Sequence, residues 1–329
     1  MVRPVFAAIA AALVLAAPAG AADFTPGSPG LDDPFFPLAG NGGYDVQHYS
    51  LDLAYDRATN RLDASVTIRA KAEQDLSSFN LDLRGYDISG LEVSGREADF
   101  TRDGQELTVV PARGLVRNQA FIVRVQYSGT PEPIVDPDDS LEGWVPTDDG
   151  AFVVNEPQGS PGWYPANDNP RDKATYDFAI TVPEGRTAIA NGRLLSKQPR
   201  DGRTTWRWRE DSPMASYLAT ATNGVFDLRI DEVDGIPLYQ AVDPDVANPA
   251  LARERLAAEA EIISFFSGLY GPYPFSSGGG VVDLGGVGYA LESQTKSMYD
   301  VEGNPNGAPG APFGLPSTSY IDFVCDSSA

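Results

Sequence analysis

The stretch Tyr49-Ser50-Leu51-Asp52-Leu53-Ala54-Tyr55 places an apolar or aromatic side chain at every second position. Successive side chains of a strand point to opposite faces, so this period of two predicts a β-strand with one buried face. The same alternation returns at Leu62/Ala64/Val66/Ile68, Phe79/Leu81/Leu83, Phe121/Val123/Val125/Tyr127, Tyr176/Phe178/Ile180/Val182 and Trp206/Trp208.

Turn-forming residues separate these runs, and no helical pattern of any length precedes residue 245. Short strands with Gly, Asn and Asp between them are typical of antiparallel β architectures. The sequence therefore predicts a sandwich-like β domain over residues 44–235, with turns at Gly85, Asp103-Gly104, Gly129, Asn191-Gly192 and Asp201-Gly202.

Residues 236–302 predict a second domain that contains a helix as well as short strands. Apolar residues spaced three or four apart predict one amphipathic helix from Pro249 to Tyr270, which Gly271-Pro272 should end. Short strands are expected at 281–284 and 289–292, whereas residues 303–329 read as a Gly- and Pro-rich loop and an aberrant C-terminal tail.

The first 22 residues resemble a secretory signal peptide, with Arg3 before an apolar core and Ala19-Gly20-Ala21 as a cleavage site. The apolar stretch is too short to span a bilayer comfortably, so we expect a secreted protein rather than an anchored one. Residues 23–43, rich in Pro, Gly and Asp, predict a flexible leader.

The chain carries a formal net charge of −22, which argues against nucleic acid or anionic membranes as partners, because both favour a basic surface. Cys325 is the only cysteine and cannot form an internal disulfide. Stability must therefore come from burial, and 42% hydrophobic residues suffice for a substantial core.

Four segments in one order carry a resemblance to a known family. They are 44–49, the Pro- and Asn-rich run 162–176, 212–218 and 265–275. With Gly288-Tyr289-Ala290-Leu291-Glu292 after them, they resemble the M1 family of zinc aminopeptidases from about Tyr44 to Met298. The resemblance implies a saddle-like β-sandwich domain followed by the opening portion of a thermolysin-like α+β catalytic domain.

An exopeptidase must distinguish a free α-ammonium from an internal amide, and a fixed carboxylate can do so by pairing with the cation. The resemblance assigns this role to Glu292, and assigns the peptide-backbone groove to Gly288, Tyr289 and Ala290. It also suggests that Glu156 contacts the same amine. The structural alternatives are an exposed glutamate at a strand end for Glu292 and a solvated loop glutamate for Glu156.

The metal side of the family's site has no counterpart in this sequence. A zinc-binding H-E-x-x-H motif needs two histidines, and His48 is the only one. The motif is due close to Cys325, near the last residue of the sequence. Zinc belongs to the intact family member; for this chain we expect no metal and no catalytic residues.

Other residues that could suggest a catalytic, phosphate-binding or calcium-binding site have structural explanations. His48 lies in an expected strand without a partner histidine, so we interpret it as structural. The glycines at 278–280 and 285–288 fit no phosphate-binding motif and predict turns and close backbone approaches. Asp136, Asp138 and Asp139 lack the spacing of a calcium loop and are interpreted as a solvated loop.

The first interpretation is therefore a secreted M1-type metallo-aminopeptidase, present as a truncated and inactive form, whose parent hydrolyses the N-terminal peptide bond of peptides. The alternative is a secreted module, or pseudoenzyme, that binds peptide N-termini without hydrolysing them.

Overall fold

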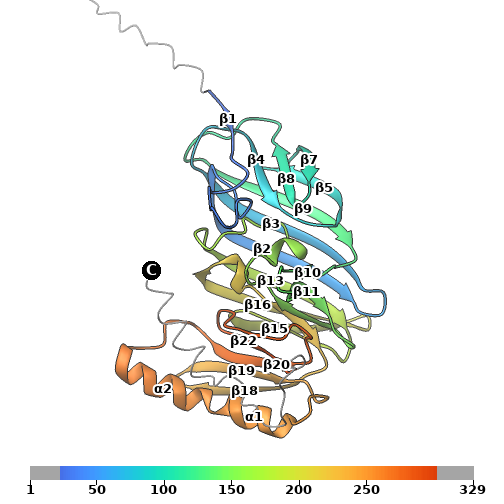
Figure 1. Ribbon diagram of the computed structural model, residues 1–329, viewed down its shortest axis with the longest axis vertical. Helices are drawn as coiled ribbons and strands as arrows, with labels where there is room; N and C mark the ends of the chain where they lie inside the picture. Colours follow the sequence, from blue (N-terminus) through green and yellow to red (C-terminus); the bar gives the residue numbers. More distant parts are fainter. Residues whose placement is uncertain (1–22, 302–329) are drawn as a thin grey trace, which may run out of the picture.

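A computed structural model describes residues 23–301, which form four β-sheets and one pair of helices (Figure 1). The largest sheet has eight strands in the order β15-β16-β13-β2-β3-β9-β5-β6. Their bounds are β2 Tyr44–Asp56, β3 Arg61–Ala72, β5 Asp87–Val93, β6 Arg96–Glu97, β9 Ala120–Gly129, β13 Ala174–Pro183, β15 Arg193–Arg200 and β16 Arg203–Met214.

Two smaller sheets pack with the large one around a common core. The first has the order β1-β4-β8-β7 and the second β10-β11-β12-β17-β14. The bounds are β1 Thr25–Pro26, β4 Leu76–Asp82, β7 Asp99–Asp103, β8 Glu106–Val110, β10 Ile134–Val135, β11 Leu141–Pro146, β12 Ala151–Val154, β14 Thr187–Ala190 and β17 Ala221–Gly224. Two short 3-10 helices, η1 (Ser160–Gly162) and η2 (Ser216–Leu218), lie in the connections.

The alternating pattern in the sequence is confirmed as the pattern of burial. In β2, Tyr49, Leu51, Leu53 and Tyr55 are all at most 2% exposed, while the residues between them are not buried. The expected turns are also found: Asp201 and Gly202 both have positive φ, as does Gly192. The prediction of a mainly-β domain is therefore confirmed.

The fourth sheet has the order β18-β19-β20-β22-β21 and carries both helices (Figure 1). Its β18 pairs with β19, so this sheet begins at Asp227, within the range that the sequence assigned to the β domain. The bounds are β18 Asp227–Val233, β19 Ile236–Val242, β20 Gly278–Asp283, β21 Ala290–Leu291, β22 Ser297–Asp300, α1 Pro249–Ala257 and α2 Glu259–Tyr270.

The single helix expected from Pro249 to Tyr270 is two helices that meet at Ala258. Leu256 and Ile263 are buried as expected, against β19 and β20. Glu259, at the start of α2, points inward: its Oε1 accepts a hydrogen bond from Gly279 N at 2.7 Å. Leu269 remains 60% exposed.

Residues 23–43 differ from the expected flexible leader. β1 pairs with β4, and Asn41 is only 1% exposed. Asn41 N donates to Asn167 Oδ1 at 2.6 Å, and its side-chain amide donates to Asp82 Oδ2 at 3.0 Å. The segment is thus held to the β domain by strand pairing and by the buried hydrogen bonds of Asn41.

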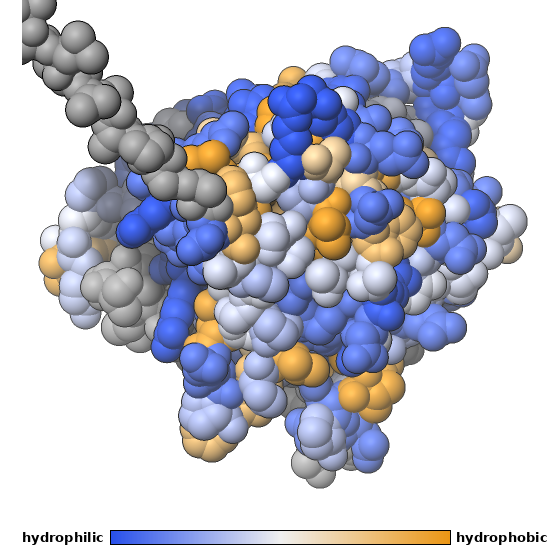
Figure 2. All heavy atoms as spheres, turned by 90° about the horizontal axis from the view of Figure 1, so that it is seen from above, coloured by the Kyte–Doolittle hydropathy of each residue, from blue (hydrophilic) through white to orange (hydrophobic). Residues whose placement is uncertain are grey.

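Figure 2 shows the end of the molecule that is uppermost in Figure 1. Apolar side chains are spread there in small groups among hydrophilic ones. Within residues 23–301, no helix has the length and apolarity needed to cross a membrane. The expected signal peptide and the tail that contains Cys325 lie outside the described residues.

Candidate amine-binding site

The segment 288–292 lies at the edge of the fourth sheet. Strand β21 is the last in the strand order and pairs, among the described strands, with β22 alone. Ala290 is exposed and Leu291 is buried, so the strand has one side chain in the core and one in solvent. An edge strand can bind the extended backbone of a peptide through main-chain hydrogen bonds.

The glycine-rich turn before β21 wraps around one carboxylate. Asp300 Oδ1 accepts hydrogen bonds from Gly285 N at 2.9 Å and Gly286 N at 3.1 Å, and Oδ2 accepts from Gly288 N at 2.6 Å. At Gly285, an added Cβ would lie 2.6 Å from the Phe152 ring. The glycines therefore serve a tight turn and a close approach to the β domain, as the sequence suggested.

Tyr289 connects this turn to the β domain. Its ring is partly buried, and its hydroxyl donates to the carbonyl oxygen of Leu141 in β11 at 3.0 Å. Burial, together with the nearby carboxylates of Glu142 and Glu156, raises the pKa of Tyr289. The phenol therefore stays a neutral hydrogen-bond donor at physiological pH.

Glu292 follows β21 directly and is partly buried. Its Oε1 accepts a hydrogen bond from the hydroxyl of Tyr217 in η2 at 3.4 Å. A carboxylate has about four lone-pair positions, so one phenol leaves acceptor capacity for a cation. The amine-binding role that the resemblance assigns to Glu292 stays a prediction.

Glu156 lies on an exposed loop that the core holds in place from both sides. Next to it, Asn155 accepts a hydrogen bond from Trp163 Nε1 at 2.8 Å, and its amide donates to the carbonyl oxygen of Ala219. On the other side, Gln158 N donates to Glu142 Oε2 at 2.9 Å. The loop is thereby fixed close to Tyr289 and to the segment that carries Tyr217.

Glu142 is the buried support of this loop. It is 1% exposed, and burial raises its pKa to about 8. Its backbone neighbour, Leu141, supplies the carbonyl oxygen that binds Tyr289. Glu142 and Tyr217 were not singled out from the sequence: Tyr217 lies inside the recognised segment 212–218, whereas no local pattern distinguishes Glu142 from a surface glutamate.

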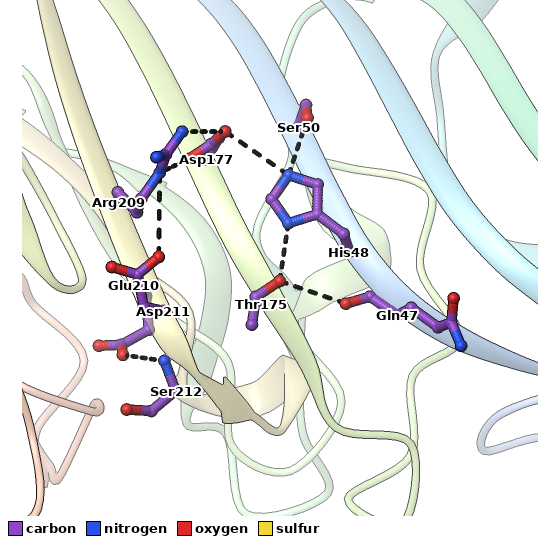
Figure 3. A network of polar contacts seen from close by, with 9 residues as sticks. All are labelled: Gln47, His48, Ser50, Thr175, Asp177, Arg209, Glu210, Asp211 and Ser212. Atoms are coloured by element: carbon purple, nitrogen blue, oxygen red, sulfur yellow. Dashed lines mark hydrogen bonds and ion pairs between the residues drawn. The ribbon is translucent and has the colours of Figure 1, made fainter.

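His48 lies elsewhere, in the network of the eight-stranded sheet that Figure 3 shows. Its Nδ1 lies 2.8 Å from Thr175 Oγ1, and its Nε2 lies 3.1 Å from Ser50 Oγ and 3.6 Å from Asp177 Oδ2. Burial lowers its pKa, although Asp177 opposes the shift. With its ring nitrogens engaged across β2 and β13, His48 is a structural residue, as expected.

A zinc ion does not fit the described residues. No group of three His, Cys, Asp or Glu side chains within 23–301 is arranged to hold a metal ion. In the acidic loop, Ser140 N donates to Asp138 Oδ1 at 3.1 Å and Asp139 N donates to the carbonyl oxygen of Asp136 at 2.9 Å, which makes it a locally hydrogen-bonded turn.

A family model places residues 45–218 in the peptidase M1 N-terminal domain. Leukotriene A-4 hydrolase of Xenopus laevis is 24% identical over 203 residues, which cover 56% of this chain and 32% of that protein. Leucine aminopeptidase 2 of Candida albicans is 24% identical over 184 residues, 55% of this chain and 28% of that protein. The chain spans about a third of the length of these relatives.

Solved structures extend the likeness beyond the β domain. One is a variant of an M1 zinc metallopeptidase from Deinococcus radiodurans bound to the substrate Tyr-Ser-Ala, with a TM-score of 0.69 and 27% identity over 80% of this chain and 61% of that one. A two-domain M1 zinc metallopeptidase variant bound to L-arginine has a TM-score of 0.71 and 27% identity, covering 82% and 63% of the two chains. The family model and these structures agree with the motifs and with the fold: the chain belongs to the M1 peptidase family.

Proposed function

We propose that Glu292 and Glu156 bind the free N-terminal amine of a peptide, in the manner of an M1-type aminopeptidase. The observation that carries the proposal is the position of Glu292, partly buried beside the Tyr217 hydroxyl at the end of edge strand β21. A partly desolvated carboxylate discriminates an ammonium from an amide better than an exposed one, because its attraction is less screened.

Strand β21 supplies the backbone groove of this proposal. The exposed main chain at Gly288, Tyr289 and Ala290 can pair with the first residues of an extended peptide, while Glu292 receives its amine. The bound Tyr-Ser-Ala of the Deinococcus radiodurans relative supports a peptide as the ligand.

Hydrolysis of the N-terminal peptide bond by an M1 peptidase uses zinc held by two histidines, and the 329-residue chain contains one histidine. We therefore propose that this polypeptide binds peptides without hydrolysing them, with neither nucleic acid nor membrane as a partner. The same amine site could serve a dedicated binding module, which is the alternative function and shares this prediction.

We also propose export. A signal peptide within residues 1–22 is cleaved after Ala21 or Ala22, so the mature protein should begin at Ala22 or Asp23. N-terminal sequencing of the protein from the culture medium tests this, and an intact Met1 on cell-associated protein would contradict it.

The binding proposal is tested by isothermal titration of the full chain with Tyr-Ser-Ala and with N-acetylated Tyr-Ser-Ala. We expect acetylation to weaken binding at least about tenfold, because a hydrogen bond to a charged group contributes about 1.5–3 kcal/mol. Glu292→Gln should remove most of this selectivity and Glu156→Gln part of it. Glu254→Gln, on the exposed side of α1, is the matched control. Equal affinities of the wild type for both peptides would reject amine recognition.

A further inference from the structure

Lys296 lies four residues after Glu292 and is completely buried, with 0% of its surface exposed. Its Nζ donates hydrogen bonds to the carbonyl oxygens of Gly192 and Thr295, both at 2.9 Å, and to Ser277 Oγ at 3.3 Å. An ammonium has three N–H donors, so these acceptors satisfy it completely.

Two aromatic rings and two carboxylates surround the amine of Lys296. Its Nζ lies 4.7 Å from the centre of the Tyr239 ring and 5.4 Å from that of Trp208. Burial lowers the pKa of Lys296 to about 7, while the carboxylates of Glu210 and Glu259 act to raise it. Burying a lysine costs free energy, which its hydrogen bonds and aromatic contacts offset, so its position calls for an explanation.

The partners of this lysine belong to both parts of the molecule. Gly192 is in the turn between β14 and β15 of the β domain, whereas Ser277 precedes β20 of the fourth sheet. The contact is reinforced next to Lys296, because Gly192 N donates to Thr295 Oγ1 at 2.7 Å. The turn packs closely against β16: a Cβ at Gly192 would lie 1.8 Å from the carbonyl oxygen of Arg209.

The same turn also holds the segment of Tyr217. Asn191 Nδ2 donates to the carbonyl oxygen of Leu218 at 2.9 Å and to that of Gln294 at 2.6 Å. Asn191 therefore bonds the residue after Tyr217 and a residue two positions after Glu292. The Asn191-Gly192 turn therefore holds both the segment that carries Tyr217 and the segment that carries Glu292.

We propose that Lys296 is a positioning residue for Glu292. By donating one hydrogen bond to the carbonyl oxygen of Gly192, it fixes the segment 292–296 to the turn that also holds Tyr217, and so sets the Glu292 carboxylate in its amine-binding position. The inference rests on the amine-binding function proposed above. It explains how the β domain and the fourth sheet are held together so that Tyr217 and Glu292 stay close to each other.

The test compares Lys296→Met, which keeps length and burial but loses the donors, with Lys197→Met. Lys197 is exposed, and its Nζ lies 4.4 Å from the centre of the Trp206 ring. It therefore shares the aromatic contact of Lys296 but not the contact with the Asn191-Gly192 turn. The readout is the ratio of affinities for Tyr-Ser-Ala and its N-acetylated form, because a general loss of stability does not change this ratio in the folded fraction.

We expect Lys296→Met to lower the selectivity for the free amine severalfold but less than Glu292→Gln does, because a displaced carboxylate still attracts the cation. Lys197→Met should retain the wild-type ratio. Hydrogen exchange of residues 288–293 should accelerate in Lys296→Met alone. If Lys296→Met does not fold, Thr295→Val removes the neighbouring bond to Gly192 N and should show the same two changes in weaker form.

A folded Lys296→Met with wild-type selectivity and wild-type exchange at 288–293 would overturn the inference. A wild-type protein without selectivity for the free amine would reject the proposed function and, with it, the positioning role of Lys296. Faster hydrogen exchange at residues 288–293 in Lys296→Met would then show that the Lys296 hydrogen bonds stabilise the fold without a role in binding.

Discussion

The hydroxyl of Tyr289 donates to the carbonyl oxygen of Leu141 at 3.0 Å, and this bond ties the edge strand of the fourth sheet to the β domain. Leu141 comes 148 positions earlier in the chain. The position of Glu292 relative to the loop of Glu156 therefore depends on contacts between the two parts of the molecule, not on either part by itself.

Tyr289→Phe should destabilise the protein by about 1 kcal/mol, because it removes one partly buried hydrogen bond and leaves the Leu141 carbonyl without this donor. Urea unfolding followed by tryptophan fluorescence measures the change. Tyr270→Phe, at a tyrosine that is 68% exposed, should have no measurable effect. Equal stability of the two variants would show that the Tyr289 hydroxyl is not a support of the site.

The β domain could be predicted because its signal is local. Tyr49, Leu51, Leu53 and Tyr55 lie on one strand face, and their burial follows from the period of two alone. The path of residues 23–43 could not be predicted in this way. Asn41 binds Asn167, 126 positions away, and a Pro-, Gly- and Asp-rich composition is equally typical of a loose segment.

The residues of the candidate site also differ in whether the sequence could predict them. The resemblance to a family indicated Glu292 and Glu156 as candidate site residues, because it implies roles that composition cannot. Lys296 was not, because its contact with Gly192 joins residues 104 positions apart and nothing nearby marks it as buried. Sequence patterns reveal faces of strands and helices, whereas contacts between the fourth sheet and the β domain appear only in the fold.

Glu142→Gln should flatten the pH dependence of stability. The pKa of Glu142 is raised from 4.5 to about 8 in the folded protein, so the folded state binds its proton more tightly than the unfolded chain does. Its contribution to stability is complete below pH 4.5 and is lost as the pH rises towards 8. Urea unfolding at pH 5, 6.5 and 8 should show the wild type losing more stability across the series than the variant. Parallel curves would mean that Glu142 titrates normally.

Gly279→Ala should be severely destabilising, by about 3 kcal/mol or more. Gly279 has a φ of +128°, and an added Cβ would lie 2.0 Å from the carbonyl oxygen of Tyr239, in the sheet that holds β21. Gly286→Ala is the matched control: its φ is +67°, but no atom lies within 4 Å of the added carbon, so only about 1 kcal/mol is expected. Thermal unfolding separates the two, and similar values would contradict the close approach of β19 and β20.

His48→Gln should leave peptide binding unchanged and alter stability below neutral pH. Burial lowers the pKa of His48 from 6.5, so the unfolded chain takes up the proton more readily and the wild type loses stability as the pH falls through this range. The variant should lose less between pH 7 and pH 5 in urea unfolding. A loss of affinity for Tyr-Ser-Ala in His48→Gln would refute the structural role.

The purified 329-residue chain should not hydrolyse an aminoacyl anilide, with or without added zinc. The chemistry needs a metal that polarises the carbonyl and activates water, and a chain with one histidine cannot supply two histidine ligands. The measurement is the release of nitroaniline from leucine p-nitroanilide, with an active M1 aminopeptidase as the positive control. A zinc-dependent rate above that of the buffer, retained through repeated chromatography and abolished in Glu292→Gln, would show that this polypeptide assembles a catalytic metal site of its own.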